Sequence, residues 1–492
     1  MGIMRTKSVE QAIRDTEEPE FQLRKALGPL DLTVFGIGVI IGTGLFVLTG
    51  QAAANFAGPG VTLSFVVAGV ACTLAALCYA EFASTVPVAG SAYTFSYASV
   101  GEFLAWIIGW DLILEFVVGA SAVSVGWAGY FGEFLNSFFG ISLPGAITGG
   151  VVNLPAMGIA LLLTVVLVIG IRVSSSVNIG ITVVKLAVVF FFIGVGIFLV
   201  NPANWDPFIP SAGAGAASAT KEGADPSLLQ VITGAEQQSF GFAGIITAAA
   251  VVFFAYIGFD VVATTSEEAR NPQRDLPIGI LASLGICTLL YVVVSLILTG
   301  MVPYSDLAND APLATALREA GQPFAAGFIS IGIIAGLTSV IMILMLGQSR
   351  VAFAMSRDNL LPQFLARTHP RFRTPYIITI ITGVIVSLLA GFVDLQALAE
   401  LVNIGTLFAF ILVSISVIVL RRTNPDMRRA FRTPLVPVVP ILSVLICLYL
   451  MVNLPLPTWY RFVGWMVIGL VIYFAYGFWF SRLRREGSAE EA

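Results

Sequence analysis

The sequence predicts an all-α membrane protein with twelve transmembrane helices. Apolar residues make up 57% of its 492 residues and charged residues only 11%, whereas charged residues form about a quarter of a typical soluble domain. Twelve apolar stretches are long enough to cross a bilayer, and small residues interrupt the first and the sixth. These observations exclude a soluble globule, and nothing in the composition indicates nucleic-acid binding.

The chain begins with a polar segment, residues 1–30, that contains no short apolar stretch followed by a cleavage site. We therefore expect a cytoplasmic N-terminal segment and not a signal peptide. The apolar stretches then predict spans at about 31–56, 61–85, 103–128, 153–171, 178–200, 242–265, 278–300, 324–350, 375–392, 395–420, 435–454 and 462–481.

The spans group into two units of five. Residues 31–200 form the first unit, an external loop at 201–241 includes a run rich in Gly, Ala and Ser, and residues 242–420 form the second unit. Residues 421–481 add two peripheral helices, and 482–492 form a cytoplasmic tail. Because five is odd, the two units enter the membrane from opposite faces, so a shared fold makes them inverted repeats.

The distribution of basic residues predicts the orientation. The loops on the side of the two termini hold 21 of the 25 Lys and Arg residues, and the opposite loops hold three. By the positive-inside rule, both termini lie in the cytoplasm. We expect an integral protein of the bacterial inner membrane, in contact with lipid.

The two interrupted spans predict the substrate site. The first contains Gly36, Gly38, Gly42 and Gly44, and the sixth is interrupted around Gly258. A break at membrane depth is tolerated where the loosened backbone lines a cavity, and paired breaks in corresponding positions are typical of transporters. The alternative is that these glycines only allow close helix packing.

Four motifs carry a resemblance to a known family: Ile41–Phe46; Phe254–Asp260 with Ala263–Glu268; Asn271–Pro277; and Ala354–Pro362. With these motifs the chain resembles the amino acid–polyamine–organocation superfamily, and within it the cationic amino acid transporters and their bacterial relatives, over residues 20–480. The resemblance implies a leucine-transporter-like fold, with a 5+5 inverted repeat, broken helices 1 and 6 and two peripheral helices. Vertebrate members have two more spans, so the match is to the bacterial type and "cationic" specificity does not transfer directly.

At the breaks, freed backbone groups are expected to bind an amino acid. The amides of Thr43 and Gly44 begin a half-helix and favour a carboxylate, and Gly44, which has no Cβ, is expected to leave the space that a carboxylate needs beside the amide. Freed carbonyls suit the ammonium group. The predicted substrate-binding residues are Ile40, Ile41, Gly42, Thr43, Gly44, Phe254, Ala255 and Ile257, with Phe254 as an outer gate.

Lys185 is the basic residue inside a span, about 10 Å deep. A buried ammonium marks an ion or proton path, or it snorkels to the interface. The resemblance implies proton coupling by Lys185, whose ammonium stands where sodium-coupled relatives hold Na⁺ against carbonyls of the first span and hydroxyls of the eighth. Thr338 and Ser339 are the candidate hydroxyls.

Several further residues are candidates for a side-chain pocket or gate. Glu115 could pair with a cationic substrate side chain or take part in polar helix packing. Tyr256 and Asp260 belong to the sixth-span motif. Glu267 and Glu268, with nearby arginines, predict a solvated salt-bridge cluster that latches an inner gate. We expect no metal and no cofactor.

These features predict a secondary active transporter, not an enzyme, that carries L-amino acids with protons by alternating access. The alternatives are an exchanger specific for cationic amino acids or, in another class, a membrane-embedded enzyme or channel. The predicted spans contain no histidine, which argues against an enzyme. The sequence contains no ATP-binding P-loop, which argues against a primary pump. Without a clear carboxylate in the pocket, small neutral amino acids are favoured as substrates. Oligomer or small-protein contacts stay open.

Overall fold

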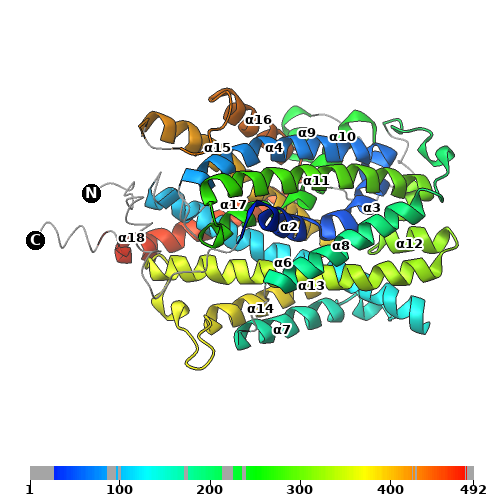
Figure 1. Cartoon of the computed structure of the whole chain (residues 1–492), viewed down its shortest axis with the longest axis horizontal. Coiled ribbons are helices and arrows are strands. Elements are labelled where there is room, and N and C mark those ends of the chain that lie inside the picture. The colour runs from blue at the N-terminus through cyan, green and yellow to red at the C-terminus, as the bar shows by residue number, and fades with distance from the viewer. Residues whose placement is uncertain are drawn as a thin grey trace, which may run out of the picture.

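The chain forms a bundle of helices that run roughly along one common direction (Figure 1). The computed structural model describes residues 27–85, 93, 96–97, 101–170, 175–212, 225–234, 240–423, 425–426, 429–482 and 484. Isolated bridges are the sole extended pairings among them, and no strand forms. The predicted N-terminal segment up to residue 26, the middle of the Gly/Ala/Ser-rich run and the tail beyond residue 484 lie outside this part of the chain.

Eight segments of the described chain are long and apolar enough to cross a membrane: Gly44–Thr85, Glu102–Phe139, Ile179–Gly196, Gly241–Ala263, Pro272–Met301, Pro323–Arg357, Leu395–Thr423 and Leu456–Phe480. Four apolar helices are shorter: Pro29–Ile40, Leu154–Ile169, Tyr376–Phe392 and Val438–Val452. The all-helical membrane class is therefore confirmed. The count of twelve crossings and the inverted repeat remain predictions.

The first span is interrupted where the sequence predicted. Helix α2 (Pro29–Ile40) ends before an extended residue, Ile41, with ψ at 104°. The chain resumes as a π-helical turn, η1 (Gly44–Leu48), followed by α3 (Thr49–Ala52) and a second π-helical turn, η2 (Ala53–Ala57). A short 3-10 turn, η3 (Gly58–Gly60), leads into α4 (Val61–Thr85).

The sixth span is interrupted in a similar way. Helix α10 (Gly241–Val252) tightens into a 3-10 turn, η6 (Phe253–Tyr256), and the next half is also 3-10, η7 (Asp260–Glu268). Between them, Ile257 is extended and Gly258 has φ at +114°, a conformation that favours glycine. A Cβ on Gly258 would lie 2.6 Å from Val39 Cγ1, so glycine also lets this break approach α2.

The remaining long helices surround these two spans. They are α6 (Glu102–Phe139), α7 (Leu154–Ile169), α8 (Ser175–Gly196), α11 (Pro272–Met301), α13 (Pro323–Arg357), α14 (Tyr376–Phe392) and α15 (Leu395–Thr423). Helix α6 packs along α13, α11 packs on α2 and α4, and α7 lies beside α14. The interior is therefore built around the breaks, with α6, α8, α11, α13 and α15 all in reach of them.

The last apolar helices are α16 (Val438–Val452) and α17 (Leu456–Ile472), which continues through η10 (Tyr473–Gly477) into α18 (Phe478–Phe480). Helix α16 packs on α4 and α15, and α17 on α15 and α6. Short elements occupy the connections: η4 (Gly145–Ile147), η5 (Pro202–Trp205), α9 (Leu228–Thr233), η8 (Tyr304–Leu307), α12 (Pro312–Glu319) and η9 (Gln363–Ala366).

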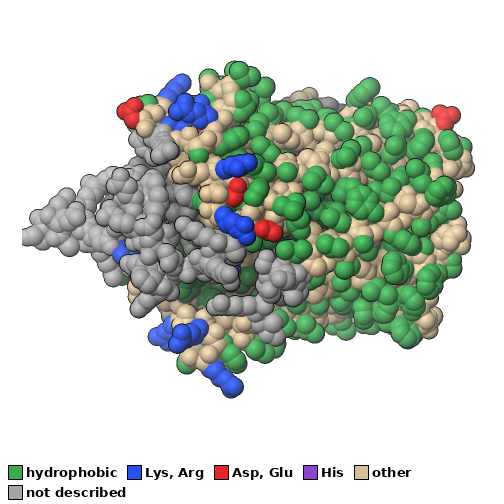
Figure 2. Space-filling model, viewed as in Figure 1, with side chains coloured by type: hydrophobic (Ala, Val, Ile, Leu, Met, Phe, Trp, Pro, Cys, Tyr) green, Lys and Arg blue, Asp and Glu red, His purple; other side chains and the backbone are tan. Residues whose placement is uncertain are grey.

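The surface separates apolar and charged side chains. Figure 2 shows apolar side chains over most of the visible face, whereas Lys and Arg gather towards one end, where α15 connects to α16 and α13 connects to α14. This is the distribution of a protein that exposes an apolar belt to lipid and a basic end to an aqueous phase.

Candidate functional site

The first break leaves backbone amides free at the start of a half-helix. The amides of Leu45 and Phe46 both donate to the Gly42 carbonyl, each at 3.1 Å. For the amides of Gly42, Thr43 and Gly44, the described residues provide no hydrogen-bond partner. Because such amides carry the positive end of the helix dipole, this turn can bind an anion.

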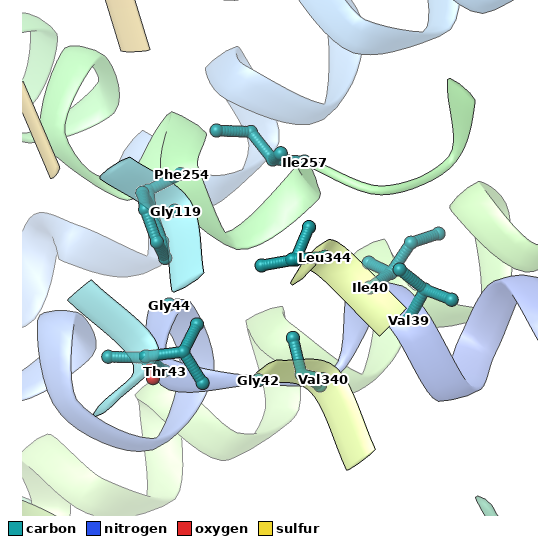
Figure 3. A pocket seen from close by; sticks show the side chains of 11 residues that line it. Val39, Ile40, Gly42, Thr43, Gly44, Gly119, Phe254, Ile257, Val340 and Leu344 are labelled. Atoms are coloured by element: carbon teal, nitrogen blue, oxygen red, sulfur yellow. The ribbon is translucent and has the colours of Figure 1, made fainter. Parts of the chain in front are cut away.

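A small cavity lies between the two breaks (Figure 3). The cavity volume is about 20 Å³, little more than the ~10–15 Å³ that one water molecule needs. The walls come from both breaks and from α6 and α13: Val39, Ile40, Gly42, Thr43, Gly44, Gly119, Val123, Phe254, Ile257, Val340 and Leu344. An amino acid can enter only after these walls have moved apart.

Thr43 supplies the one polar side chain in this lining. Its hydroxyl oxygen is buried and has no hydrogen-bond partner among the described residues. The other lining residues have aliphatic or aromatic side chains or are glycines. The cavity therefore combines free backbone amides and one hydroxyl with an apolar wall.

Gly42 and Gly44 have different surroundings. A Cβ on Gly44 would lie 2.6 Å from the Ala255 backbone nitrogen, so this glycine lets the two breaks touch. A Cβ on Gly42 would come no closer than 3.7 Å to the Val340 side chain. Gly44 thus fits the close-packing explanation, whereas Gly42 borders open space in the cavity.

Six of the eight predicted substrate-binding residues line the cavity: Ile40, Gly42, Thr43, Gly44, Phe254 and Ile257. Ile41 and Ala255 do not. The Ile41 carbonyl accepts a hydrogen bond from Lys185, and Ala255 packs against Gly44. The sequence did not point to the four lining residues on α6 and α13, since apolar residues in an apolar helix carry no distinguishing signal.

Tyr291 and Asn403 hold carbonyls next to the breaks, and the sequence analysis missed both. The Tyr291 hydroxyl lies 2.9 Å from the Ile40 carbonyl oxygen and 2.8 Å from that of Ala255, so it spans the two breaks. The Asn403 amide donates to the carbonyls of Ala250 and Val251, just before the second break. The sequence does contain a signal for both residues, because each is a polar side chain inside an apolar helix.

Lys185 lies fully buried on α8. Its ammonium donates to the Gly38 carbonyl and, at 3.2 Å, to that of Ile41. A Cβ on Gly336 of α13 would lie 2.8 Å from Lys185 Cγ, so this glycine makes room for the lysine stem. The side chain turns inward to the end of α2, and the snorkelling alternative is wrong.

The two predicted hydroxyls bond elsewhere. Thr338 accepts a hydrogen bond from Trp127 Nε1 at 3.0 Å and donates to the Ile334 carbonyl. Ser339 donates to the Gly336 carbonyl within α13. Neither hydroxyl has a hydrogen bond to Lys185, so the ammonium rests on carbonyls of the first span.

The buried acids lie beside the cavity, not in its lining. Glu115 is one turn from the lining residue Gly119 on α6, and its carboxyl faces Thr406 and the carboxyls of Asp111 and Asp260. Asp260 also lies against backbone amides at the start of η7. These acids form no metal-binding group in the described part of the chain.

Two further candidates, Phe254 and Tyr256, lie on the 3-10 turn before the second break. The Tyr256 hydroxyl donates to the Phe65 carbonyl at 2.7 Å and does not line the cavity. Phe254, the predicted gate, is a lining residue and is 7% exposed. The side chains of Glu267 and Glu268 lie outside the described residues, so the predicted latch near them stays a prediction.

Two broken spans that meet at a small central cavity are typical of membrane transporters. A family model for amino acid permeases matches residues 27–476. The chain belongs to this family, in the amino acid–polyamine–organocation superfamily, and the predicted resemblance is confirmed. It is a transporter and not an enzyme.

Named relatives agree with the family assignment. The chain is 48% identical to a branched-chain amino acid permease of Bacillus subtilis, over 98% of this chain and 99% of the relative. It is 47% identical to a methylthioribose transporter of the same bacterium, over 92% and 94%. It is 32% identical to the mouse cationic amino acid transporter 4, over 97% and 90%.

Proposed function

We propose that this protein carries aliphatic L-amino acids across the bacterial cell membrane together with protons. The observation that carries the proposal is the pairing of free amides at Gly42, Thr43 and Gly44 with an apolar cavity wall. The amides and the Thr43 hydroxyl would bind the substrate carboxylate. The carbonyls of the second break would bind its ammonium group.

The apolar wall supports aliphatic side chains as the substrate class. Val123, Val340 and Leu344 face the space that a substrate side chain would fill. No carboxylate lines the cavity, so a lysine or arginine side chain would bury an unpaired charge, at a cost of several kcal/mol. The name of the branched-chain permease fits this chemistry, and that of the cationic transporter fits it less well.

The methylthioribose relative raises a second candidate substrate. A sugar hydroxyl that is buried without a partner costs about 1–3 kcal/mol, and Thr43 offers the single polar side chain in the lining. Methylthioribose also lacks the carboxylate that the free amides suit. This geometry favours an amino acid.

Lys185 supports proton coupling. Its ammonium bonds to two carbonyls at the end of α2, as a bound cation would. In the proposed cycle, protonated Lys185 braces α2 against α8 and α13, and loss of the proton to the cytoplasm loosens α2 and releases the substrate. The coupled ion is a proton and not sodium.

The proposed topology has twelve crossings, a 5+5 inverted repeat and both termini in the cytoplasm. The two interruptions at the starts of the two units support the repeat. The basic end seen in Figure 2 supports the orientation.

Uptake by purified protein in proteoliposomes tests the proposal. With an inward proton gradient and no sodium, radiolabelled leucine or valine should accumulate, and excess alanine, valine or isoleucine should compete. Competition by arginine, lysine or methylthioribose alone would refute the substrate class. Uptake that requires amino acid already inside the vesicle would identify an exchanger.

A further inference from the structure

Within the connection between α13 and α14, residues 363–375 form a compact basic loop. Arg367, Arg371 and Arg373 are all exposed on it. Among the described residues none of the three has a carboxylate partner, and the sequence contains no Asp or Glu between residues 359 and 393. The loop therefore presents three guanidinium groups that no described carboxylate neutralises.

His369 folds this loop. Its Nδ1 accepts hydrogen bonds from the backbone amides of Arg371, at 3.2 Å, and Phe372, at 3.3 Å. Its own amide donates to the Thr374 carbonyl, and the Arg373 amide donates to the His369 carbonyl, both at 2.8 Å. The turn is thus closed by four hydrogen bonds around one residue, two to the His369 side chain and two to its backbone, and it fixes where the arginines emerge.

The loop is attached to the end of a lipid-facing helix pair. The Thr374 hydroxyl donates to the Val168 carbonyl of α7 at 2.7 Å, and Gly170 packs against Thr374. Helices α7 and α14 lie side by side, and each exposes an apolar face. These faces contain Leu161, Leu162, Val165 and Ile169 on α7, and Ile380, Ile381, Val384, Ile385 and Leu388 on α14.

We propose that the basic loop and the α7–α14 face together bind an anionic phospholipid, with the arginines on its phosphate headgroup and the apolar face against its acyl chains. The charge is complementary, since residues 134–205, which include α7, also contain no acidic residue. Figures 1 and 2 show basic side chains gathered over this connection, where the apolar surface ends. Guanidinium groups suit phosphate because they donate in a planar fork.

Native mass spectrometry of the purified full chain tests the proposal. The protein is titrated with phosphatidylglycerol or with phosphatidylcholine of identical acyl chains, and the affinities for the two lipids are compared. Each basic residue near a membrane surface contributes about a fivefold preference for anionic lipid, so three give on the order of a hundredfold. R367Q/R371Q/R373Q should lose most of this preference. R422Q/R432Q/R461Q, which removes three exposed arginines elsewhere, should keep it.

A second variant tests the fold of the loop. His369→Ala removes the acceptor of two backbone amides, keeps all three arginines and should weaken phosphatidylglycerol binding severalfold. Equal affinity for the two lipids in the wild type, or equal losses in both triple variants, would overturn the site. Displacement of the lipid by millimolar inorganic phosphate would assign it to a soluble anion instead.

Discussion

At the first break the carbonyl end is occupied and the amide end is open, whereas at the second break the amide end faces the chain's own carboxylate. Lys185 bonds to the carbonyls of Gly38 and Ile41, and the amides of Gly42 to Gly44 are free. At the second break, Asp260 lies against the amides that begin η7. One gap thus already holds the Lys185 side chain, and the other already holds the Asp260 carboxyl group.

This difference gives the proposed site a direction. A zwitterion can place its carboxylate on the free amides of the first break, because no protein group competes there. Its ammonium must then point towards the carbonyls of the second break, where Tyr291 holds the one from Ala255. The two breaks, each with one extended residue, Ile41 or Ile257, thus differ in chemistry through Lys185 and Asp260.

Replacing the cation at the first break should have the largest effect. Lys185→Ala leaves the buried carbonyls of Gly38 and Ile41 without their donor, and each buried acceptor left unpaired costs about 1–3 kcal/mol. We expect proton-driven leucine uptake in proteoliposomes to fall at least about a hundredfold, on the scale of 1.4 kcal/mol per factor of ten.

Leucine counterflow at equal pH on both sides provides the control for Lys185→Ala. It should persist, because it needs the substrate site but no net proton movement. A full response to the pH gradient in the variant, or sodium dependence of the wild type, would show that Lys185 does not couple transport to protons.

Closing the open amide end is expected to have the next largest effect. Gly42→Ala adds a methyl group whose nearest neighbour is the Val340 side chain at 3.7 Å, so the fold accepts it while the cavity shrinks. Leucine affinity should fall about tenfold to a hundredfold, the cost of overpacking a filled site by ~1–3 kcal/mol. Scintillation proximity binding measures this.

A matched glycine separates cavity loss from helix effects. Gly285→Ala on α11 adds the same methyl group where no atom lies within 4 Å, and leucine affinity should stay at the wild-type value. If Gly42→Ala also binds leucine normally, the substrate carboxylate does not lie on this turn. Gly44→Val is less informative, because its side chain would meet the Ala255 backbone and disturb the contact between the breaks.

The sequence was sufficient to place both breaks, because four glycines between residues 36 and 44 mark the first and Gly258 marks the second. It also placed Lys185 inside a span, since charge stands out against apolar neighbours. It pointed to Gly44 as the glycine that leaves room for the carboxylate, whereas in the structure Gly44 packs against Ala255 and Gly42 borders open space in the cavity. That difference depends on how the two spans approach each other.

Helix rotation explains the remaining errors. Thr338 and Ser339 lie on the predicted helix, but their hydroxyls bond to Trp127 and to α13 itself, not to Lys185. The rotation of α13 about its axis is set by packing against α6, which a single sequence does not reveal. Tyr291 and Asn403 were missed for the same reason: their partners lie 36 or more positions away along the chain.

Cutting the connection between the breaks should have a moderate effect. Tyr291→Phe removes the hydroxyl that spans the Ile40 and Ala255 carbonyls and leaves buried acceptors with one partner fewer. The expected loss of stability is about 1–3 kcal/mol, seen as a lower melting temperature in detergent. Tyr256→Phe is the control for stability alone, because its hydroxyl bonds to Phe65 outside the breaks. Leucine affinity should fall in Tyr291→Phe and not in Tyr256→Phe, and equal affinities would show that the Tyr291 bridge does not shape the site.

The smallest expected effect belongs to Thr43, where affinity and stability should change in opposite directions. Its hydroxyl is buried without a partner in the closed protein, so Thr43→Val, which keeps the shape, should leave stability unchanged or raise it by ~1 kcal/mol. The same change removes a donor to the substrate carboxylate, worth about 0.5–1.5 kcal/mol, so leucine affinity should fall about fivefold. Thr43→Ser, which keeps the hydroxyl, should restore binding. A parallel fall of stability and affinity in Thr43→Val would mean that the hydroxyl supports the fold, and the open end of the first break would then consist of backbone amides alone.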